Sequence, residues 1–153
     1  MEIVNYNGTS LAFIGDAWMS LKVRMHVLEQ GYQRPRELQR RCSSWECAHA
    51  QARMLRQLEE EAFFDEDEQE IIRRGRNATI HTKAKNADIM TYRHATALEA
   101  VIGYLYLYHK SERLELLWQA MVRIGETVCQ SSYMVRMSSR SCWMTDGRSM
   151  RSG

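Results

Sequence analysis

The sequence lacks the features that mark secreted, membrane-bound or zinc-binding proteins. It has no run of about 18 apolar residues and no basic start followed by a short apolar stretch, so neither a membrane span nor a signal peptide is indicated. Its four cysteines lack CxxC spacing, and its five histidines are scattered. We therefore expect a cytoplasmic protein with reduced thiols, no structural zinc and no membrane contact.

Proline and β-branched runs are also scarce. One proline in 153 residues leaves long stretches of helix-forming residues uninterrupted. With 44% hydrophobic residues, the chain is long enough for one domain with a substantial core. We predict an all-α fold of about six to seven helices.

Net positive charge is absent from the main body of the chain. The formal charge is +2, but the residues from Thr127 onward carry four arginines and one aspartate, which leaves −1 for residues 1–126. Any affinity for nucleic acid must therefore come from a local patch. We divide the chain into a domain over 1–126 and a poorly ordered tail over 127–153, which is rich in Ser, Arg and Met. Docking of the tail on the body through Trp143 and the methionines is the alternative.

Periodicity and capping signals predict where the helices lie. The first should span Ser10 to Gln30, with Gly31 as its stop and an apolar stripe at three- and four-residue intervals: Leu11, Ile14, Trp18, Leu21, Met25 and Leu28. The later helices should begin at Pro35, at a capping box of Ser43 with Glu46, at Asp65 with Glu68, at Asp88 and at Ser111. The helix from Ser43 should end near Phe63, and the one from Asp65 at the arginines 73 to 76. The helix from Asp88 should end at His109, and the one from Ser111 near Gly125.

Two carboxylates interrupt otherwise apolar helices. Asp16 points nearly opposite the main stripe of the first helix, on a second face that also carries Val23 and Val27. We expect this helix to be enclosed, and an ionised carboxylate there costs several kcal/mol unless a cation or hydrogen bonds compensate. Glu99 lies at the edge of the stripe of the fifth helix, where Gly103 should leave room beside it. Two such acids suit a magnesium ion, whereas a salt bridge to an arginine or the cap of another helix is the structural alternative for Asp16.

Three segments of the chain resemble signatures of one enzyme family. LAFIGDAW and TALEAVIGYLYL are similar to the two signatures of the ribonuclease III catalytic domain, and RRGRNA followed by KNADIMTYRHATALEAVIGYLYL resembles the mini-ribonuclease III subfamily. The resemblance covers about residues 4–125 and implies the all-α endonuclease fold of that family, with no double-stranded RNA-binding domain. Ala12 and Thr96 stand where ordinary ribonuclease III has further acids, a departure that also marks the subfamily but puts the number of metal ions in doubt.

The resemblance implies a function and a cofactor. Asp16 would be the catalytic aspartate and Glu99 its metal-binding partner, holding Mg²⁺, for which Mn²⁺ can substitute. The enzyme would be an endoribonuclease that cuts double-stranded RNA, leaves 5′-phosphates and matures the precursor of the large-subunit (23S) ribosomal RNA. Assistance from a ribosomal protein stays open.

A stretch without acids, from Gly75 to Ala87, supplies candidate RNA-binding groups. Cationic side chains would bind phosphates and amides would bond to sugar or phosphate. The candidates, including the arginines just before it, are Arg73, Arg74, Arg76, Asn77, Lys83, Lys85 and Asn86. The alternative is that the arginines only neutralise the end of a helix.

A homodimer is expected both from the family and from surplus apolar residues. The second face of the first helix, with Val23 and Val27, and the run Tyr104, Tyr106 and Tyr108 exceed what one small core needs. The alternative is that the tyrosines complete the monomer core. Two further readings of the whole chain stay open: an RNA-binding or ribosome-associated module that has lost catalysis, and a helical adaptor without an RNA role.

Overall fold

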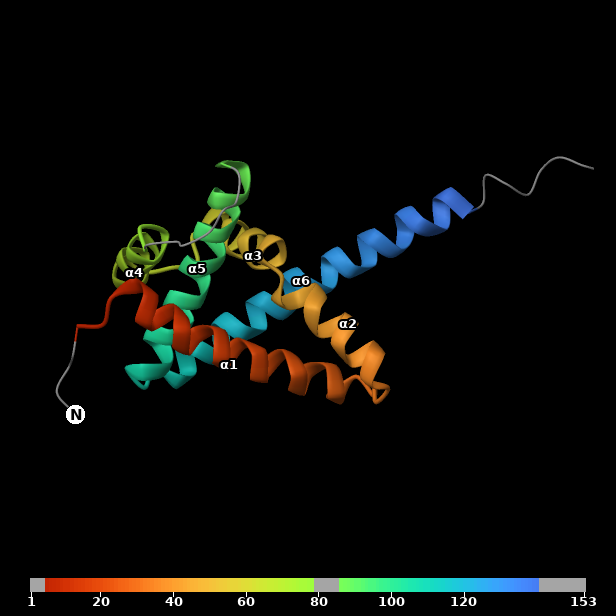
Figure 1. Cartoon of the computed structure of the whole chain (residues 1–153), viewed down its shortest axis with the longest axis horizontal. Helices are drawn as coiled ribbons and strands as arrows, with labels where there is room; N and C mark the ends of the chain where they lie inside the picture. The colour runs from red at the N-terminus through yellow and green to blue at the C-terminus, as the bar shows by residue number, and fades with distance from the viewer. Residues whose placement is uncertain (1–4, 79–85, 141–153) are drawn as a thin grey trace, which may run out of the picture.

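The computed structural model describes residues 5–78 and 86–140, excluding the side chains of residues 86, 87 and 128–140. These residues form α-helices and no strand, so the all-α prediction is confirmed (Figure 1). The six helices described are α1 (Gly8–Glu29), α2 (Pro35–Glu46), α3 (Ala48–Glu60), α4 (Glu66–Arg76), α5 (Asn86–Leu107) and α6 (Ser111–Arg140). None of them is both long and apolar enough to cross a membrane.

Helix α1 begins at Gly8, two residues before the predicted Ser10, and ends just before the predicted glycine stop, but it buries a different face. The side chain of Asn7 accepts a hydrogen bond from the Ser10 N–H, and Gly31 follows the helix with a φ of 89°. The predicted stripe was partly wrong, because Leu21, Met25 and Leu28 are exposed. The face that α1 buries repeats every four residues through Leu11, Gly15, Met19, Val23 and Val27. Helix α1 carries apolar residues on all its faces, so their periodicity alone does not predict which face is buried.

The boundary between α2 and α3 also differs from the prediction. Pro35 occupies the first turn of α2 as expected. Ser43 does not cap a third helix, because it lies inside α2, and the chain breaks instead at the extended Cys47. The predicted cap of α4 is confirmed: Asp65 accepts from the Glu68 N–H, and the Glu68 carboxylate accepts from the Asp65 N–H.

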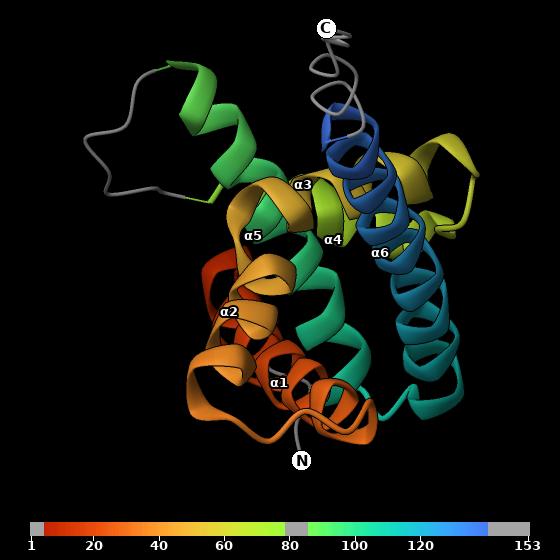
Figure 2. The same ribbon diagram turned by 90° about the vertical axis from the view of Figure 1, so that its right-hand side faces the viewer.

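Helix α5 is the centre of the fold. It contacts α1, α3, α4 and α6, and in Figures 1 and 2 the other helices are arranged around it. Its predicted stripe is confirmed, since Leu98, Val101, Ile102 and Leu105 are all fully buried. Asp88 lies in the first turn rather than at the cap, because α5 already begins at Asn86. Residues on α5 are therefore within reach of several other helices.

Helix α6 is longer than predicted. It runs to Arg140, so the end expected near Gly125 was wrong. Its first half packs on the body through Leu114, Leu117 and Met121, while its second half extends away from the other helices (Figures 1 and 2). The tail beyond residue 140, with Trp143, lies outside the described residues, and the division at residue 126 stays a prediction.

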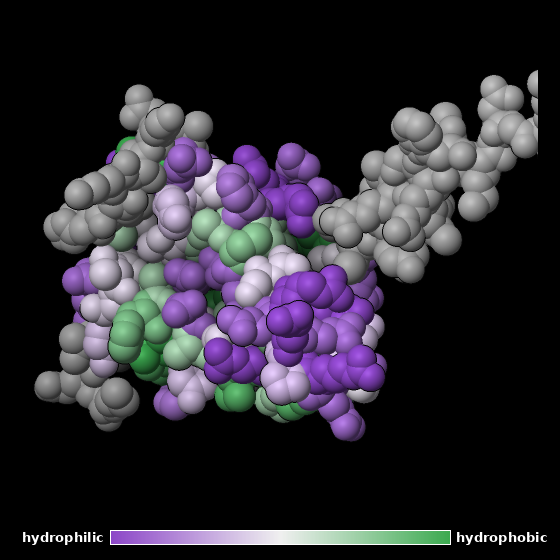
Figure 3. Space-filling model, turned by 45° about the vertical axis from the view of Figure 1, so that its right-hand side comes forward, coloured by the Kyte–Doolittle hydropathy of each residue, from purple (hydrophilic) through white to green (hydrophobic). Residues whose placement is uncertain are grey.

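The apolar surface predicted to be surplus is only partly so. Val23 and Val27 belong to the core of the chain itself, so their assignment to a dimer face was wrong. Tyr104 and Tyr108 are half-buried with ring centroids 4.8 Å apart, whereas Tyr106 is exposed. Other large apolar side chains remain open to solvent, and Figure 3 shows hydrophobic areas among hydrophilic ones. The exposed ones among the described residues are Phe13, Leu21, Met25, Leu28, Met90, Tyr92, Tyr106 and Leu116.

Candidate active site

The candidate site lies where α1 and α5 cross at backbone contact. A Cβ atom on Gly15 would come within 1.8 Å of the Glu99 carbonyl oxygen, and one on Gly103 within 1.9 Å of the Leu11 carbonyl oxygen. Only glycine permits such an approach of two helices. The space beside Gly103, predicted to be room for the Glu99 carboxylate, is thus occupied by the backbone of α1.

This crossing brings the two predicted catalytic acids together. Asp16 follows Gly15 directly on α1, and Glu99 lies one turn before Gly103 on α5. Burial and, to a lesser extent, the negative charge of Asp16 together raise the pKa of Glu99 to about 7, against a hydrogen bond from Gln51 that lowers it. Near neutral pH, about half of the Glu99 carboxyl groups are therefore protonated.

Asp16 is not enclosed, contrary to the prediction for its helix. Its side chain is exposed, whereas Glu99 is partly buried. Among the described residues, no arginine, lysine or histidine forms an ion pair with either carboxylate. The structural alternative, a salt bridge that compensates Asp16, is thus not found within the described chain. The pair combines one carboxylate open to solvent with one deeper carboxylate.

The arrangement fits a magnesium ion. Magnesium takes one or two protein carboxylates and keeps several of its waters, and the exposed side of Asp16 leaves space for them. A divalent cation would also offset the repulsion that raises the pKa of Glu99. Within the described residues, no group of three or more His, Cys, Asp or Glu side chains is placed to hold a metal ion. An ion bound at this crossing would have Asp16 and Glu99 as its protein ligands.

Gln51 is a polar residue of this site that the sequence analysis missed. It lies on α3 with 2% of its surface exposed, and it hydrogen-bonds to Glu99. A signal was present in the sequence. Gln51 shares the apolar stripe of α3 with Met54, Leu55 and Leu58, and a polar residue on such a stripe is the same anomaly that singled out Asp16.

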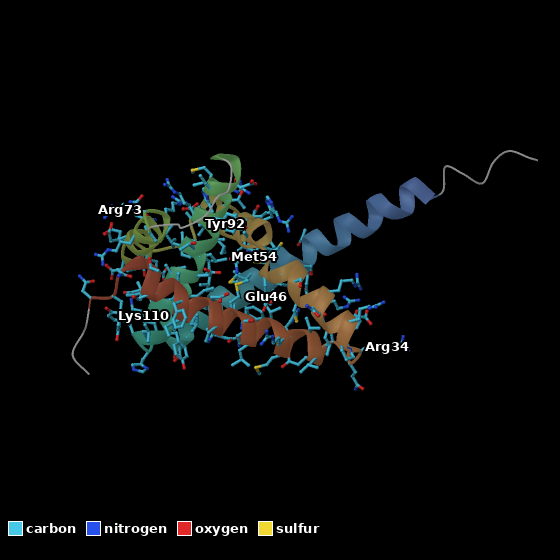
Figure 4. All side chains as sticks on the ribbon, viewed as in Figure 1. Arg34, Glu46, Met54, Arg73, Tyr92 and Lys110 are labelled. Atoms are coloured by element: carbon cyan, nitrogen blue, oxygen red, sulfur yellow. The ribbon has the colours of Figure 1, made fainter. Side chains whose placement is uncertain are left out.

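The predicted RNA-binding arginines lie together at the end of α4 but are paired with acids. Arg73 makes two hydrogen bonds of 2.8 Å to Glu70, and Arg74 donates to the same carboxylate at 2.9 Å. These bonds lower the pKa of Glu70 to about 2, so it stays ionised. Two arginines against one glutamate leave a net positive charge here, and Figure 4 shows Arg73 on the outer side of α4.

The remaining candidates are placed unequally. Arg76 pairs with Glu59, and its Nε is buried without a hydrogen-bond partner. Asn77 is exposed at the C-cap of α4. Asn86 is the first residue of α5, but its side chain lies outside the described part of the chain, as do Lys83 and Lys85 entirely.

Comparison with known proteins identifies the family. The model of the ribonuclease III domain matches residues 9–110, a segment that contains both Asp16 and Glu99. The chain is 47% identical over 111 residues to mini-ribonuclease 3 of Streptococcus pneumoniae, covering 72% of this chain and 87% of that protein. It is 42% identical over 118 residues to mini-ribonuclease 3 of Staphylococcus aureus, covering 77% and 88% respectively.

A further relative and a solved structure agree with this match. Mini-ribonuclease 3 of Brevibacillus brevis is 46% identical over 123 residues, covering 79% of this chain and 90% of that protein. A crystal structure of a protein from Fusobacterium nucleatum superimposes with a TM-score of 0.70 at 31% identity, covering 80% of this chain and 98% of that one. The chain therefore belongs to the ribonuclease III family of endoribonucleases, and within it to the mini-ribonuclease 3 group.

Proposed function

We propose that this endoribonuclease cuts double-stranded RNA by magnesium-assisted hydrolysis at Asp16 and Glu99. The observation that carries the proposal is the meeting of these two acids at the α1–α5 crossing, with the pKa of Glu99 raised to about 7 by burial and by Asp16. Acids that only stabilise a fold are expected to have cationic partners, and no cation among the described residues pairs with these two.

Each carboxylate would have a separate role at the cation. Asp16, which is exposed, would bind on the solvent side, where substrate enters, and Glu99 would bind from the deeper side. Because Glu99 must be ionised to bind, cation binding displaces its proton near neutral pH. Bound magnesium supplies a water of lowered pKa and positive charge that stabilises the phosphodiester transition state. The expected products carry 5′-phosphate and 3′-hydroxyl ends.

The end of α4 would bind the RNA backbone. Arg73 and Arg74 share Glu70 but keep further N–H groups for phosphate oxygens, while the exposed Asn77 can bond to sugar or phosphate. The predicted contributions of Lys83, Lys85 and Asn86 add to this patch. A-form duplexes are recognised mainly by shape and by phosphate and 2′-hydroxyl contacts, so we propose weak sequence preference.

A twofold homodimer would place two such sites on one duplex. Phe13 is 76% exposed and stands three residues before Asp16 on α1. It lines a hollow of about 440 Å³ with Tyr6, Ile14 and Leu107. An exposed aromatic side chain beside an apolar hollow is suited to a self-complementary contact. Pairing through this surface, in place of Val23 and Val27, would bring the sites of two subunits near each other and allow both strands to be cut.

We propose the precursor of 23S ribosomal RNA as the substrate, as the resemblance of the sequence motifs to mini-ribonuclease III implies. Cleavage of that precursor would take place in the cytoplasm, and a ribosomal protein that presents the RNA would be an additional partner. Duplex RNA without ribosomal sequence would then be cut less efficiently than the precursor.

Cleavage of a labelled RNA duplex tests the proposal. The wild type should cut in the presence of Mg²⁺ or Mn²⁺ and stop when the metal is chelated. The nearly isosteric Asp16→Asn should lower the rate by about 10³-fold, because cation binding loses several kcal/mol of transition-state stabilisation. A wild type that binds duplex but cuts neither it nor the ribosomal precursor with any divalent ion would leave a non-catalytic RNA-binding module.

A further inference from the structure

Gln51 is a buried amide that connects α3 to the candidate site. Its Nε2 donates to the sulfur of Met19 on α1 at 3.5 Å, and its side chain hydrogen-bonds to the Glu99 carboxylate on α5. Because the amide nitrogen carries two hydrogens, one group can serve both acceptors. The side chain therefore contacts both helices of the crossing at the level of the acids.

The two hydrogen bonds are unequal in strength. A thioether sulfur is a weak acceptor, whereas an ionised carboxylate accepts a charge-assisted bond about twice as strong as a neutral one. Burying a side-chain amide costs free energy unless its hydrogen bonds are replaced. The bond to Glu99 is thus the main compensation for placing Gln51 where only 2% of its surface is exposed.

The amide also restricts the direction of the carboxylate. Glu99 extends from a helix whose backbone is fixed against Gly15, but its side chain has three rotatable bonds of its own. The buried amide of Gln51 can restrain one carboxylate oxygen and leave the other available to a cation.

We infer that Gln51 is a positioning residue, whose amide holds the Glu99 carboxylate so that its free oxygen and Asp16 meet one divalent cation. This inference rests on the proposed function, because it requires that Asp16 and Glu99 bind a metal. Groups that orient metal ligands in this way typically contribute 10- to 100-fold in metal affinity or activity. A purely structural tie between α3 and α5 would instead affect stability and leave metal affinity unchanged.

Binding of Mn²⁺ alone to the full-length protein, measured by calorimetry without RNA, is the test. In Gln51→Met the side chain keeps an unbranched shape of similar length but loses the donor. Gln51→Asn keeps the amide on a side chain that is one methylene too short to reach Glu99. This variant tests the role of Gln51 if Gln51→Met does not fold. Leu58→Val, on the same buried stripe of α3, is the matched control for a loss of packing.

The inference predicts about tenfold weaker Mn²⁺ binding in both Gln51 variants and an unchanged affinity in Leu58→Val. In cleavage assays, raised Mg²⁺ should restore the rate of Gln51→Met toward that of the wild type, with KM for RNA unchanged. Wild-type affinity for Mn²⁺ in the Gln51 variants, or an equal loss in the control, would overturn the inference alone. A wild type that neither binds Mn²⁺ nor cuts duplex RNA would overturn the proposed function and this inference together.

Discussion

Two glutamates of this fold, the buried Glu68 and the partly buried Glu99, have opposite surroundings. Glu68, with 0% of its surface exposed, receives hydrogen bonds of 2.7 and 2.8 Å from Arg113 and a third from the backbone of Asp65. Glu99 receives a hydrogen bond from the neutral amide of Gln51, and its charged neighbour is another acid, Asp16. The first carboxylate is compensated where it lies, whereas the second is left in need of a cation.

The difference distinguishes a carboxylate that stabilises the fold, Glu68, from one that is placed to bind a ligand, Glu99. Arg113 joins α6 to α4, and its guanidinium also lies over the ring of Phe63 at 4.1 Å, so the pair is part of the packing. At the α1–α5 crossing the fold instead holds two like charges together and gains nothing from them without a ligand. Burial and the repulsion from Asp16 destabilise the ionised form of Glu99, and only the binding of a cation offsets this cost.

Removing the partner of Glu68 should produce the largest change in stability. Arg113→Met keeps an apolar stem over Phe63 but leaves a buried carboxylate without its cation, which is expected to lower the free energy of unfolding by about 3 kcal/mol. Urea denaturation at pH 7 measures this loss. A loss below about 1 kcal/mol would mean that the Arg113–Glu68 pair stabilises the fold no more than an exposed salt bridge does, and the contrast with Glu99 would be lost.

Separating the two helices should disturb the site more than the fold. In Gly103→Ala the new Cβ would meet the Leu11 carbonyl oxygen at 1.9 Å, so α1 and α5 must move apart. We expect a loss of about 1–3 kcal/mol in stability from overpacking and a fall of about 10²-fold in cleavage rate from misplaced carboxylates. Gly31→Ala, at a site with nothing within 4 Å but with positive φ, is the control for strain without displacement of the site. Equal effects of both variants on cleavage would contradict this account.

Replacing Glu99 should stabilise the metal-free protein. The pKa of Glu99 is raised in the folded state to about 7 from an ordinary 4.5, so between these values the folded chain keeps a proton that the unfolded chain has released. The contribution of Glu99 to stability is then greatest below pH 4.5 and falls as pH rises through 7. Glu99→Gln lacks this loss and should exceed the wild type by about 1–2 kcal/mol at pH 8, after a discount for partial exposure of the group.

Thermal denaturation with a chelator across pH 4 to 8 checks this result. The two proteins should differ least at the acid end and most at the alkaline end, and adding Mg²⁺ should raise the stability of the wild type alone. Parallel curves for the two proteins would mean that Glu99 is not destabilised in the folded state.

Much of the helical framework could be predicted from local signals. The capping box of Asp65 with Glu68, the proline at the start of α2 and the buried stripe of α5 depend on nearby residues, and each is confirmed. Where several faces or caps were chemically acceptable, local signals failed. Ser43 resembled a cap although it lies inside α2, and only packing decides that α1 buries Val23 and Val27 while Leu21 is exposed.

The candidate site was predictable in its acids and not in their surroundings. Asp16 and Glu99 were identifiable because charge interrupts an apolar pattern, and family resemblance assigned their roles. The backbone contact at Gly15 and the bond from Gln51 depend on how three helices meet in space, which no single helix encodes. The assigned roles stay predictions until the variants are measured.

The glycine contacts of the crossing also bear on how the enzyme folds. Gly15 lies near one end of the matched domain and Gly103 near the other, so the site requires a contact between distant parts of the chain. Helices can form locally within microseconds, but such a distant contact must first close a long loop. Recovery of cleavage during refolding would therefore lag behind recovery of helical circular dichroism, and catalytic activity would report the docking of α1 on α5.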